Sequence, residues 1–272
     1  MSDLVLLTGA AGRIGTVLRG GLPERGWALR SLDVVPVPDP RPGEEHLVAD
    51  ATDLAAMAEA ARGAAAVVHL AGISGESTWP AIRHANIDGT YCALESARLA
   101  GVPRVVLASS NHATGYTPRP DGGPLREADA PPRPDTYYGV SKVAMEALGS
   151  LYVDRYGLDV VCLRIGSAFA EPTTVRQLAT WLSPADTVSL VDAALRAASP
   201  GFSVVWGVSD NTRRWWDLSA AEALGYRSDD DAEQYAAALI EAHGEPDPTD
   251  PVHARVGGEY TTAAFDAENF QA

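Results

Sequence analysis

Short apolar runs alternate along the 272-residue chain with longer stretches in which apolar residues recur at helical spacing. The short runs are typical of strands buried on both faces, and we expect them at residues 4–8, 28–32, 46–48, 66–71, 104–109 and 159–164. The longer stretches predict helices at residues 13–25, 54–62, 79–100, 138–156 and 187–198. This alternation indicates an α/β protein with a doubly wound parallel sheet and helices on both faces.

The first predicted strand runs directly into a glycine-rich turn, Thr8-Gly9-Ala10-Ala11-Gly12-Arg13-Ile14-Gly15. Gly9 permits a tight turn, Gly12 lets the backbone approach a pyrophosphate, and Gly15 allows the following helix to pack closely on the strand. The phosphates would then lie at the helix N-terminus. A lone glycine fingerprint often marks only a turn, but this one joins a strand to a helix, which predicts a Rossmann-type dinucleotide site.

Asp33 ends the second predicted strand, at the position where a ribose-binding carboxylate is expected. A carboxylate accepts hydrogen bonds from both ribose hydroxyls and repels a 2′-phosphate. The next residues, Val34-Val35-Pro36, supply no arginine to hold such a phosphate. The sequence therefore favours NAD over NADP, the alternative being an aspartate that caps a turn before the proline-containing loop.

Ser110, Tyr138 and Lys142 form a candidate catalytic set for hydride transfer. Tyr138 and Lys142 are four residues apart, so on a helix they share one face, and the ammonium group is expected to lower the pKa of the phenol from its ordinary value near ~10. The phenolate would take a proton from a substrate alcohol, and Ser110 would hydrogen-bond the same oxygen. A Tyr-x-x-x-Lys spacing alone often marks only a solvated helix face.

The glycine turn and Asp33 follow the ends of predicted strands, as do Asp50-Ala51, Ala71-Gly72 and Ser109-Ser110. Ligands bind at the carboxyl ends of strands in such sheets, so one crevice could hold every candidate residue. The proline-rich stretch at 118–134 is expected to be a loop beside this crevice.

The alternation weakens after residue 165, where one more strand is expected at 202–206. We therefore divide the chain into an NAD-binding Rossmann domain at 1–165, which carries the catalytic set, and a small substrate-binding region at 166–272 that is not an independent domain. The last 30 residues are polar and irregular, which predicts a docked or loosely ordered tail.

Composition narrows the function classes. The formal net charge of −15 argues against nucleic acid and anionic membranes as partners. We expect no signal peptide and no membrane span, which points to the cytoplasm. Cys92 and Cys162 lie in apolar segments and are expected to be reduced core residues rather than a bridge or a metal pair. The chemistry requires no metal.

At this point the chain resembles the extended branch of the short-chain dehydrogenase/reductase superfamily over roughly residues 4–165, through TGAAGRIG, the serine, YGVSK and the asparagine of ANIDGT. Further segments resemble the uronate dehydrogenases over nearly the whole chain, namely GIS at 72–74, ASSNHATGY at 108–116, RIGSAFAEP at 164–172, RQLATWLS at 176–183, VVWGVS at 204–209 and WWD at 215–217. This resemblance implies that NAD oxidises the C1 hydroxyl of cyclic galacturonate or glucuronate to an aldarolactone.

The resemblance also implies roles for individual residues. Cofactor contacts are expected from Gly9, Gly12, Arg13, Ile14, Gly15, Asp33, Asp50, Ala51, Leu70, Ala71, Gly72, Asn86, Ser109, Tyr138 and Lys142. Substrate contacts are expected from Ser74, Ser110, Asn111, His112, Tyr138, Ser167 and Arg176.

Arg176 would bind the carboxylate of the uronate with its planar fork of donors. Without the resemblance it would be a surface arginine, and Arg164, Arg213 and Arg214 would be equal candidates. His112 is the weaker choice of general base, because Tyr138 and Lys142 already form an acid/base unit and we expect no carboxylate to orient its imidazole.

Two alternatives remain open, and a third is disfavoured. A nucleotide-sugar epimerase or dehydratase shares the serine, tyrosine and lysine, but the epimerase usually has a longer C-terminal part. A regulatory NAD-sensing protein would typically have lost Tyr138 or Lys142, and both are present. A serine hydrolase is disfavoured because no Gly-x-Ser-x-Gly elbow occurs. Helices 79–100 and 138–156 match those of dimer interfaces in the superfamily, so a homo-oligomer is expected.

Overall fold

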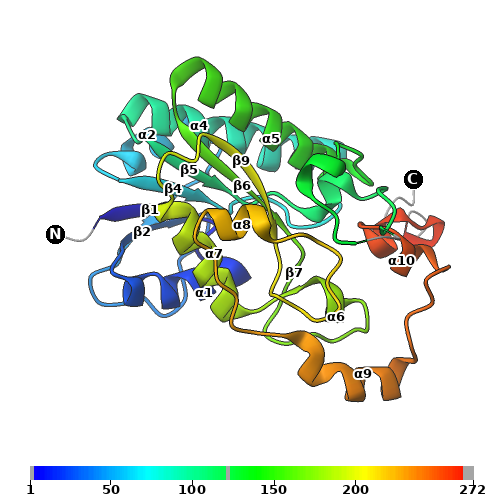
Figure 1. The fold of residues 1–272 in the computed structure, drawn as a ribbon. Helices are drawn as coiled ribbons and strands as arrows, with labels where there is room; N and C mark the ends of the chain where they lie inside the picture. Colours follow the sequence, from blue (N-terminus) through cyan, green and yellow to red (C-terminus); the bar gives the residue numbers. More distant parts are fainter. Residues whose placement is uncertain (1–2, 121–122, 266–272) are drawn as a thin grey trace.

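The computed structural model describes residues 3–120 and 123–265. A seven-stranded sheet forms its centre, with the strand order β3-β2-β1-β4-β5-β6-β9, and every pair of neighbours is parallel (Figure 1). Its strands are β1 (Leu4–Thr8), β2 (Ala28–Asp33), β3 (Glu45–Val48), β4 (Ala66–His69), β5 (Arg104–Leu107), β6 (Asp159–Ile165) and β9 (Phe202–Gly207). The short strands β7 (Ser167–Ala168) and β8 (Trp181–Leu182) form a separate pair. The predicted doubly wound α/β fold is confirmed.

Helices cover both faces of the sheet (Figure 1). The longer ones are α1 (Arg13–Gly21), α2 (Leu54–Ala61), α4 (Gly89–Ala100), α5 (Tyr137–Tyr156), α7 (Pro184–Arg196) and α9 (Ala236–His243). The shorter ones are α3 (Trp79–Ile82), α6 (Gln177–Thr180), α8 (Ser219–Ala223) and α10 (Pro251–Ala254). Helices α2, α4 and α5 pack on one face, and α1 and α7 pack on the other.

Two apolar cores follow from this layering. On the face of α1 and α7, the core includes Leu18, Leu190 and Trp206. On the face of α2, α4 and α5, it includes Met57, Leu94 and Met145. Cys92 and Cys162 both lie in this second core as free thiols, and burial raises the pKa of each thiol. The central strands β1, β4, β5 and β6 are thus buried on both sides, which explains their nearly continuous apolar sequences, whereas the edge strand β3 is exposed.

The sequence predicted the strand positions closely, with differences at the carboxyl ends. Strands β4 and β5 each stop two residues early, at His69 and Leu107, so the residues that follow them line the crevice as loop rather than as strand. The helix expected at 79–100 is divided into α3, a π-helical turn at Arg83–Asp88 and α4. The π turn contains Asn86 and lies beside the crevice, as such turns often do at functional sites.

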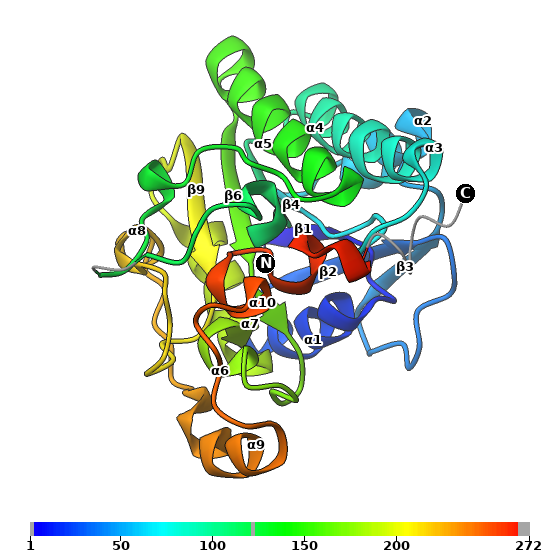
Figure 2. The same cartoon turned by 90° about the vertical axis from the view of Figure 1, so that its right-hand side faces the viewer.

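Strands β2 and β3 are added on one side of β1, and β4 and the later strands are added on its other side. The crevice opens at this switch point, at the carboxyl ends of β1 and β4. The C-terminal segment, with α10 and a 3₁₀ turn at Gly258–Thr261, crosses in front of these strand ends (Figure 2). The part of the tail that the structure describes is therefore docked, whereas residues 266–272 lie outside it. None of the described helices is long and apolar enough to cross a membrane.

Candidate active site

A cavity of about 900 Å³ lies at the carboxyl ends of the strands, a volume typical of cofactor and substrate clefts. The predicted site residues gather around it from six strand ends, from helix α5 and from the segment that contains Arg176. Its lining includes Gly9, Gly12, Arg13, Ile14, Gly15, Asp33, Asp50, Ala51, Leu70, Ala71, Gly72, Ser74, Ser109, Ser110, Asn111, His112, Tyr138, Lys142, Ser167 and Arg176. Asn86 is the one predicted site residue that lies behind this wall, and it is buried.

The glycine turn has the geometry that a bound pyrophosphate needs. Gly9 has a φ of 70°, in the left-handed region, and a Cβ on Gly15 would collide with the Gly9 carbonyl oxygen and with Ala10. Helix α1 begins after Gly12 with no side-chain cap and no acidic residue in its first turn. Its first backbone N–H groups and the positive end of its dipole therefore face the cavity without a competing anion.

Asp33 closes this turn from the end of β2. Its Oδ2 accepts the backbone N–H of Ala11 at 2.9 Å, and its Oδ1 accepts that of Val35 at 3.3 Å. The carboxylate is held at the cavity edge and has no basic side chain within 4.0 Å among the described residues. This arrangement fits a ribose diol, and the negative charge of Asp33 would repel a 2′-phosphate.

Asn86 joins two walls of the cavity. Its Oδ1 accepts the N–H of Ile73 at 2.7 Å, and its Nδ2 donates to the Ile73 carbonyl at 3.0 Å and to the Ser141 hydroxyl at 2.9 Å. The loop after β4 is thereby fixed to helix α5. In the same loop, Glu76 accepts the backbone N–H of Tyr138 at 2.8 Å and so caps the N-terminus of α5.

Ser110, Tyr138 and Lys142 lie together, but their electrostatics differ from the prediction. Burial raises the pKa of Tyr138 to about 12, although a hydrogen bond with Ser110 acts in the opposite direction. Burial also lowers the pKa of Lys142 to about 8. Its Nζ donates to the Ala108 carbonyl at 2.7 Å and lies 5.2 Å from the centre of the Tyr138 ring. The predicted lowering of the Tyr138 pKa is thus wrong for this arrangement, because burial of the phenol outweighs its hydrogen bond with Ser110.

Ser109 points its hydroxyl away from this set, into a buried ion pair. The hydroxyl donates to Glu146 at 2.7 Å, and Glu146 accepts both Nε and Nη2 of Arg164 at 2.9 Å. Arg164 is therefore neutralised inside the core and is not free to hold a substrate carboxylate.

The remaining arginine candidates also differ in whether a carboxylate of the protein already pairs with them. Arg213 pairs with Glu233 at 2.7 Å, and Arg214 pairs with Asp210. Arg176 has no acidic partner within 4.0 Å among the described residues. Of the four arginines that the sequence left open, only Arg176 combines a place on the cavity wall with an unpaired charge.

Arg176 is held by neutral groups. Its Nη1 donates to the carbonyls of Val252 at 2.6 Å and Arg255 at 3.1 Å, and its Nη2 donates to that of Val256. Its guanidinium lies 4.8 Å from the centre of the Trp215 ring. Burial lowers the pKa of Arg176 to about 10, so a further anion in the cavity would stabilise its charged form.

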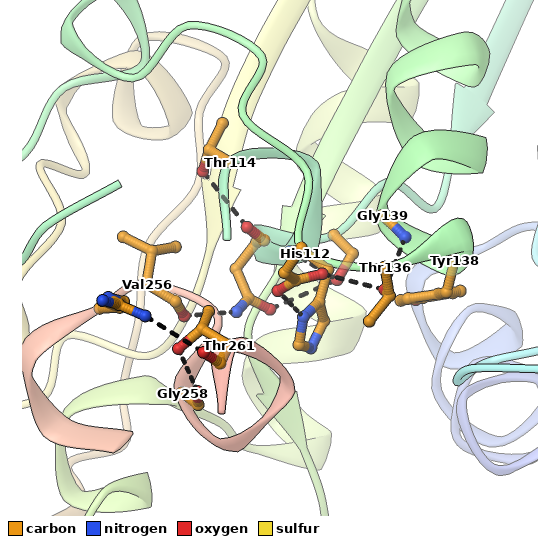
Figure 3. A network of polar contacts seen from close by, with 12 residues as sticks. His112, Thr114, Thr136, Tyr138, Gly139, Val256, Gly258 and Thr261 are labelled. Atoms are coloured by element: carbon orange, nitrogen blue, oxygen red, sulfur yellow. Dashed lines mark hydrogen bonds and ion pairs between the residues drawn. The ribbon is translucent and has the colours of Figure 1, made fainter. Parts of the chain in front are cut away.

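His112 has a partner that the sequence did not predict. Its Nδ1 lies 2.6 Å from Oδ2 of Asp135, so the expectation that no carboxylate orients this imidazole is wrong. Figure 3 shows His112 between the start of α5, at Thr136 and Tyr138, and the C-terminal segment, at Val256 and Gly258. The pair was hidden because 23 residues separate the two side chains and the proline-rich loop joins them.

Two other predicted substrate contacts already have partners in the protein. Asn111 donates from Nδ2 to the Val256 carbonyl at 2.8 Å, and Ser167 shares a hydrogen bond of 2.8 Å with Thr180. Sequence reasoning also missed the C-terminal lining of the cavity, which consists of His243, Val252, His253, Gly257, Glu259 and Tyr260. No motif marks these residues, and only their docking places them at the site.

The fold and cleft define a dinucleotide-binding enzyme, and the comparisons with known proteins agree. Residues 5–216 match the model of the NAD dependent epimerase/dehydratase family, and the chain belongs to this family. These findings confirm the predicted superfamily, the NAD cofactor and the assignment as an oxidoreductase.

More specific similarities cover the whole chain. It is 41% identical to a uronate dehydrogenase of Pseudomonas putida over 95% of this chain and 96% of that one. The crystal structure of a tyrosine-to-alanine mutant of uronate dehydrogenase from Agrobacterium tumefaciens, complexed with NAD, has a TM-score of 0.88 at 40% identity and covers 95% of this chain and 97% of that one. An NAD-dependent glucose-6-phosphate dehydrogenase of Haloferax volcanii is 36% identical over 86% of this chain and 96% of its own length.

Proposed function

We propose that this protein oxidises the C1 hydroxyl of cyclic hexuronates, D-galacturonate and D-glucuronate, to the aldarolactone with NAD as hydride acceptor. The single observation that carries this proposal is Arg176, whose unpaired guanidinium lines the cavity that also holds Ser110 and Tyr138. A sugar with a carboxylate at one end and an oxidisable hydroxyl at the other matches both groups. The similarity to uronate dehydrogenases over almost the whole chain supports the same substrate class.

The residues around the glycine turn would hold NAD. The N-terminus of α1, with Gly9, Gly12, Arg13, Ile14 and Gly15, suits the pyrophosphate, and Asp33 suits the adenosine ribose. Further cofactor contacts are proposed for Asp50, Ala51, Leu70, Ala71, Gly72, Ser109, Tyr138 and Lys142, while Asn86 would support the wall behind them. When bound, NAD supplies the electron acceptor for the hydride.

Tyr138 is proposed as the base that takes the proton of the C1 hydroxyl, and Ser110 as the donor that orients the same oxygen. With a pKa of about 12, the Tyr138 phenol is almost fully protonated near neutral pH and cannot act as a base. The reaction therefore needs a positive charge beside Tyr138 that stabilises the phenolate. Lys142 is the buried cation on the same helix face. Its proposed role is to stabilise the phenolate and to bind the nicotinamide ribose.

Arg176 would fix the opposite end of the sugar. The three backbone carbonyls that it contacts and the Trp215 ring hold its planar fork in place before substrate arrives, which lowers the entropy cost of binding. Ser74, Asn111, His112 and Ser167 are proposed to contact the sugar hydroxyls between the two ends. According to this proposal, residues 1–165 bind NAD, and residues 166–272 contribute the contact with the carboxylate of the uronate.

NADH absorbance tests the proposal directly. Purified protein is mixed with NAD and, in parallel, with galacturonate, glucuronate, glucose, glucose 6-phosphate or UDP-glucose. We expect NADH to form with the two uronates and at least ~100-fold more slowly with glucose, because glucose leaves Arg176 without its anion. A response to glucose 6-phosphate or UDP-glucose alone would reject the uronate assignment in favour of another anionic sugar.

We also propose that the protein is a homo-oligomer and works in the cytoplasm. Helices α4 and α5 lie side by side on one face of the molecule and expose Tyr91, Leu99, Leu151 and Tyr156, which suits a contact between two copies (Figure 1). The two free thiols suit a reducing compartment. Light scattering in solution would test the first proposal, with a monomer mass as the contrary result.

A further inference from the structure

Asp135 is a buried carboxylate in a space that three glycines leave open. A Cβ on Gly115, Gly139 or Gly257 would collide with its carboxyl atoms. These glycines come from three separate parts of the chain: the turn after β5, helix α5 and the C-terminal segment. Three independent segments thus make room for one carboxylate beside the cavity.

The contacts of Asp135 point to His112. The side chain of Asp135 is 0% exposed and that of His112 is 16% exposed, and the distance between Oδ2 and Nδ1 is 2.6 Å. The other oxygen, Oδ1, accepts the hydroxyl of Thr136 at 3.0 Å. A carboxylate can only accept hydrogen bonds, so Nδ1 of His112 carries the proton that is shared with Asp135.

The orientation of His112 is fixed from its faces as well. Tyr260 lies against the imidazole, with ring centres 4.1 Å apart and an interplanar angle of 32°. The Tyr138 ring is 5.6 Å away, in an edge arrangement. His112 lines the cavity and Asp135 does not, so the ring edge opposite Asp135, which carries Nε2, is the one left for a ligand.

We infer that Asp135 is a positioning residue for the sugar subsite: it fixes the tautomer and orientation of His112, so that Nε2 meets a sugar hydroxyl. This inference rests on the proposed function for the identity of the ligand. The arrangement resembles other sites in which a buried carboxylate orients an imidazole, and it makes His112 dependent on a residue that touches no substrate. Tyr138 keeps its own role as base.

The kinetic test is a double-mutant cycle with Asp135→Asn, His112→Ala and the combination of the two. Because Asp135 acts through His112, each single variant should raise the KM for uronate by about tenfold to a hundredfold, and the double variant should be no worse than His112→Ala. The KM for NAD should stay unchanged, and the KM effect should exceed the kcat effect. Asp129→Asn, an exposed aspartate of the same connection, is the matched control. Additive losses would overturn the inference.

A measurement without substrate separates this inference from the proposed function. Nitrogen-15 NMR of the imidazole, assigned by comparison with His112→Ala, should show a proton on Nδ1 in the unmodified protein and a changed tautomer population in Asp135→Asn. An unchanged tautomer would overturn the inference even if uronate is oxidised. The expected change would support it even if the preferred sugar is a different one.

Discussion

The two halves of the cavity are built in different ways. In the nucleotide half, the glycine turn and Asp33 lie within 25 residues of one another along the chain, and backbone geometry does most of the shaping. In the sugar half, Arg176 depends on carbonyls about 80 residues away, at Val252 and Val256, and Asn111 depends on a carbonyl 145 residues away. One half is a local motif, and the other exists only when distant segments meet.

This difference suggests how each half can vary. A strand, a turn and a helix N-terminus recognise a pyrophosphate wherever they occur, so the cofactor can stay constant. The sugar half uses side chains from the C-terminal segment, which can change without disturbing the sheet. Relatives named for uronate and for glucose 6-phosphate are similar in sequence to this chain over most of their length, in agreement with a fixed nucleotide half and a variable sugar half.

The largest effect is expected at the point where the halves meet. Tyr138→Phe removes the proposed base but keeps the ring, so turnover of uronate should fall by about 10³-fold or more. NAD affinity, measured by fluorescence titration, should stay within about threefold. The neighbouring Tyr137→Phe is the matched control, because Tyr137 is partly exposed at the helix start. Retained turnover in Tyr138→Phe would reject the assignment of the base.

The next largest effect tests the sugar half. Arg176→Ala should lower kcat/KM for uronate by about 10²- to 10³-fold, since a partly buried charge pair is worth ~2–5 kcal/mol when one partner is removed. The activity with a neutral aldose should change much less. Arg213→Ala removes an arginine that pairs with Glu233 and should leave uronate kinetics unchanged. Equal losses for uronate and neutral aldose would mean that Arg176 only holds the C-terminal segment.

The contrast also explains what the sequence could predict. The parallel sheet, the glycine turn and Asp33 follow from apolar runs and short motifs, so their places in the fold could be predicted well. The Asp135–His112 pair could not, because neither residue has a local signature and a proline-rich loop separates them. The raised Tyr138 pKa was missed for a related reason: sequence gives the distance to Lys142 along a helix, but not how deeply both are buried.

A smaller effect, on cofactor preference, is expected from a substitution in the nucleotide half. Asp33→Asn keeps the oxygen that accepts the Ala11 N–H but removes the negative charge. The ratio of kcat/KM for NAD over NADP should fall by about tenfold to a hundredfold, because repulsion of the 2′-phosphate disappears. The KM for uronate should not move, since Asp33 belongs to the other half. A shift in the uronate KM without a change in cofactor preference would contradict this division.

The smallest effect is expected on the free energy of unfolding, when Lys142 is replaced. Its pKa of about 8 lies below the ordinary value of 10.5, and this difference corresponds to about 3 kcal/mol of unfavourable charge burial at neutral pH. Between pH 8 and 10.5 the unfolded chain holds a proton that the folded chain has released, so stability rises with pH in that window. Lys142→Met removes this penalty but also the hydrogen bond to the Ala108 carbonyl.

The variant without NAD should therefore be more stable at pH 7 by ~1–3 kcal/mol, although it should lose turnover. Urea unfolding of both proteins at pH 7 and at pH 10.5 measures the difference, and other titrating groups cancel in that comparison. The gain should shrink at pH 10.5, where the folded native lysine is neutral. A variant that is less stable than the parent at pH 7 would show that the Ala108 contact outweighs the cost of burying the Lys142 charge.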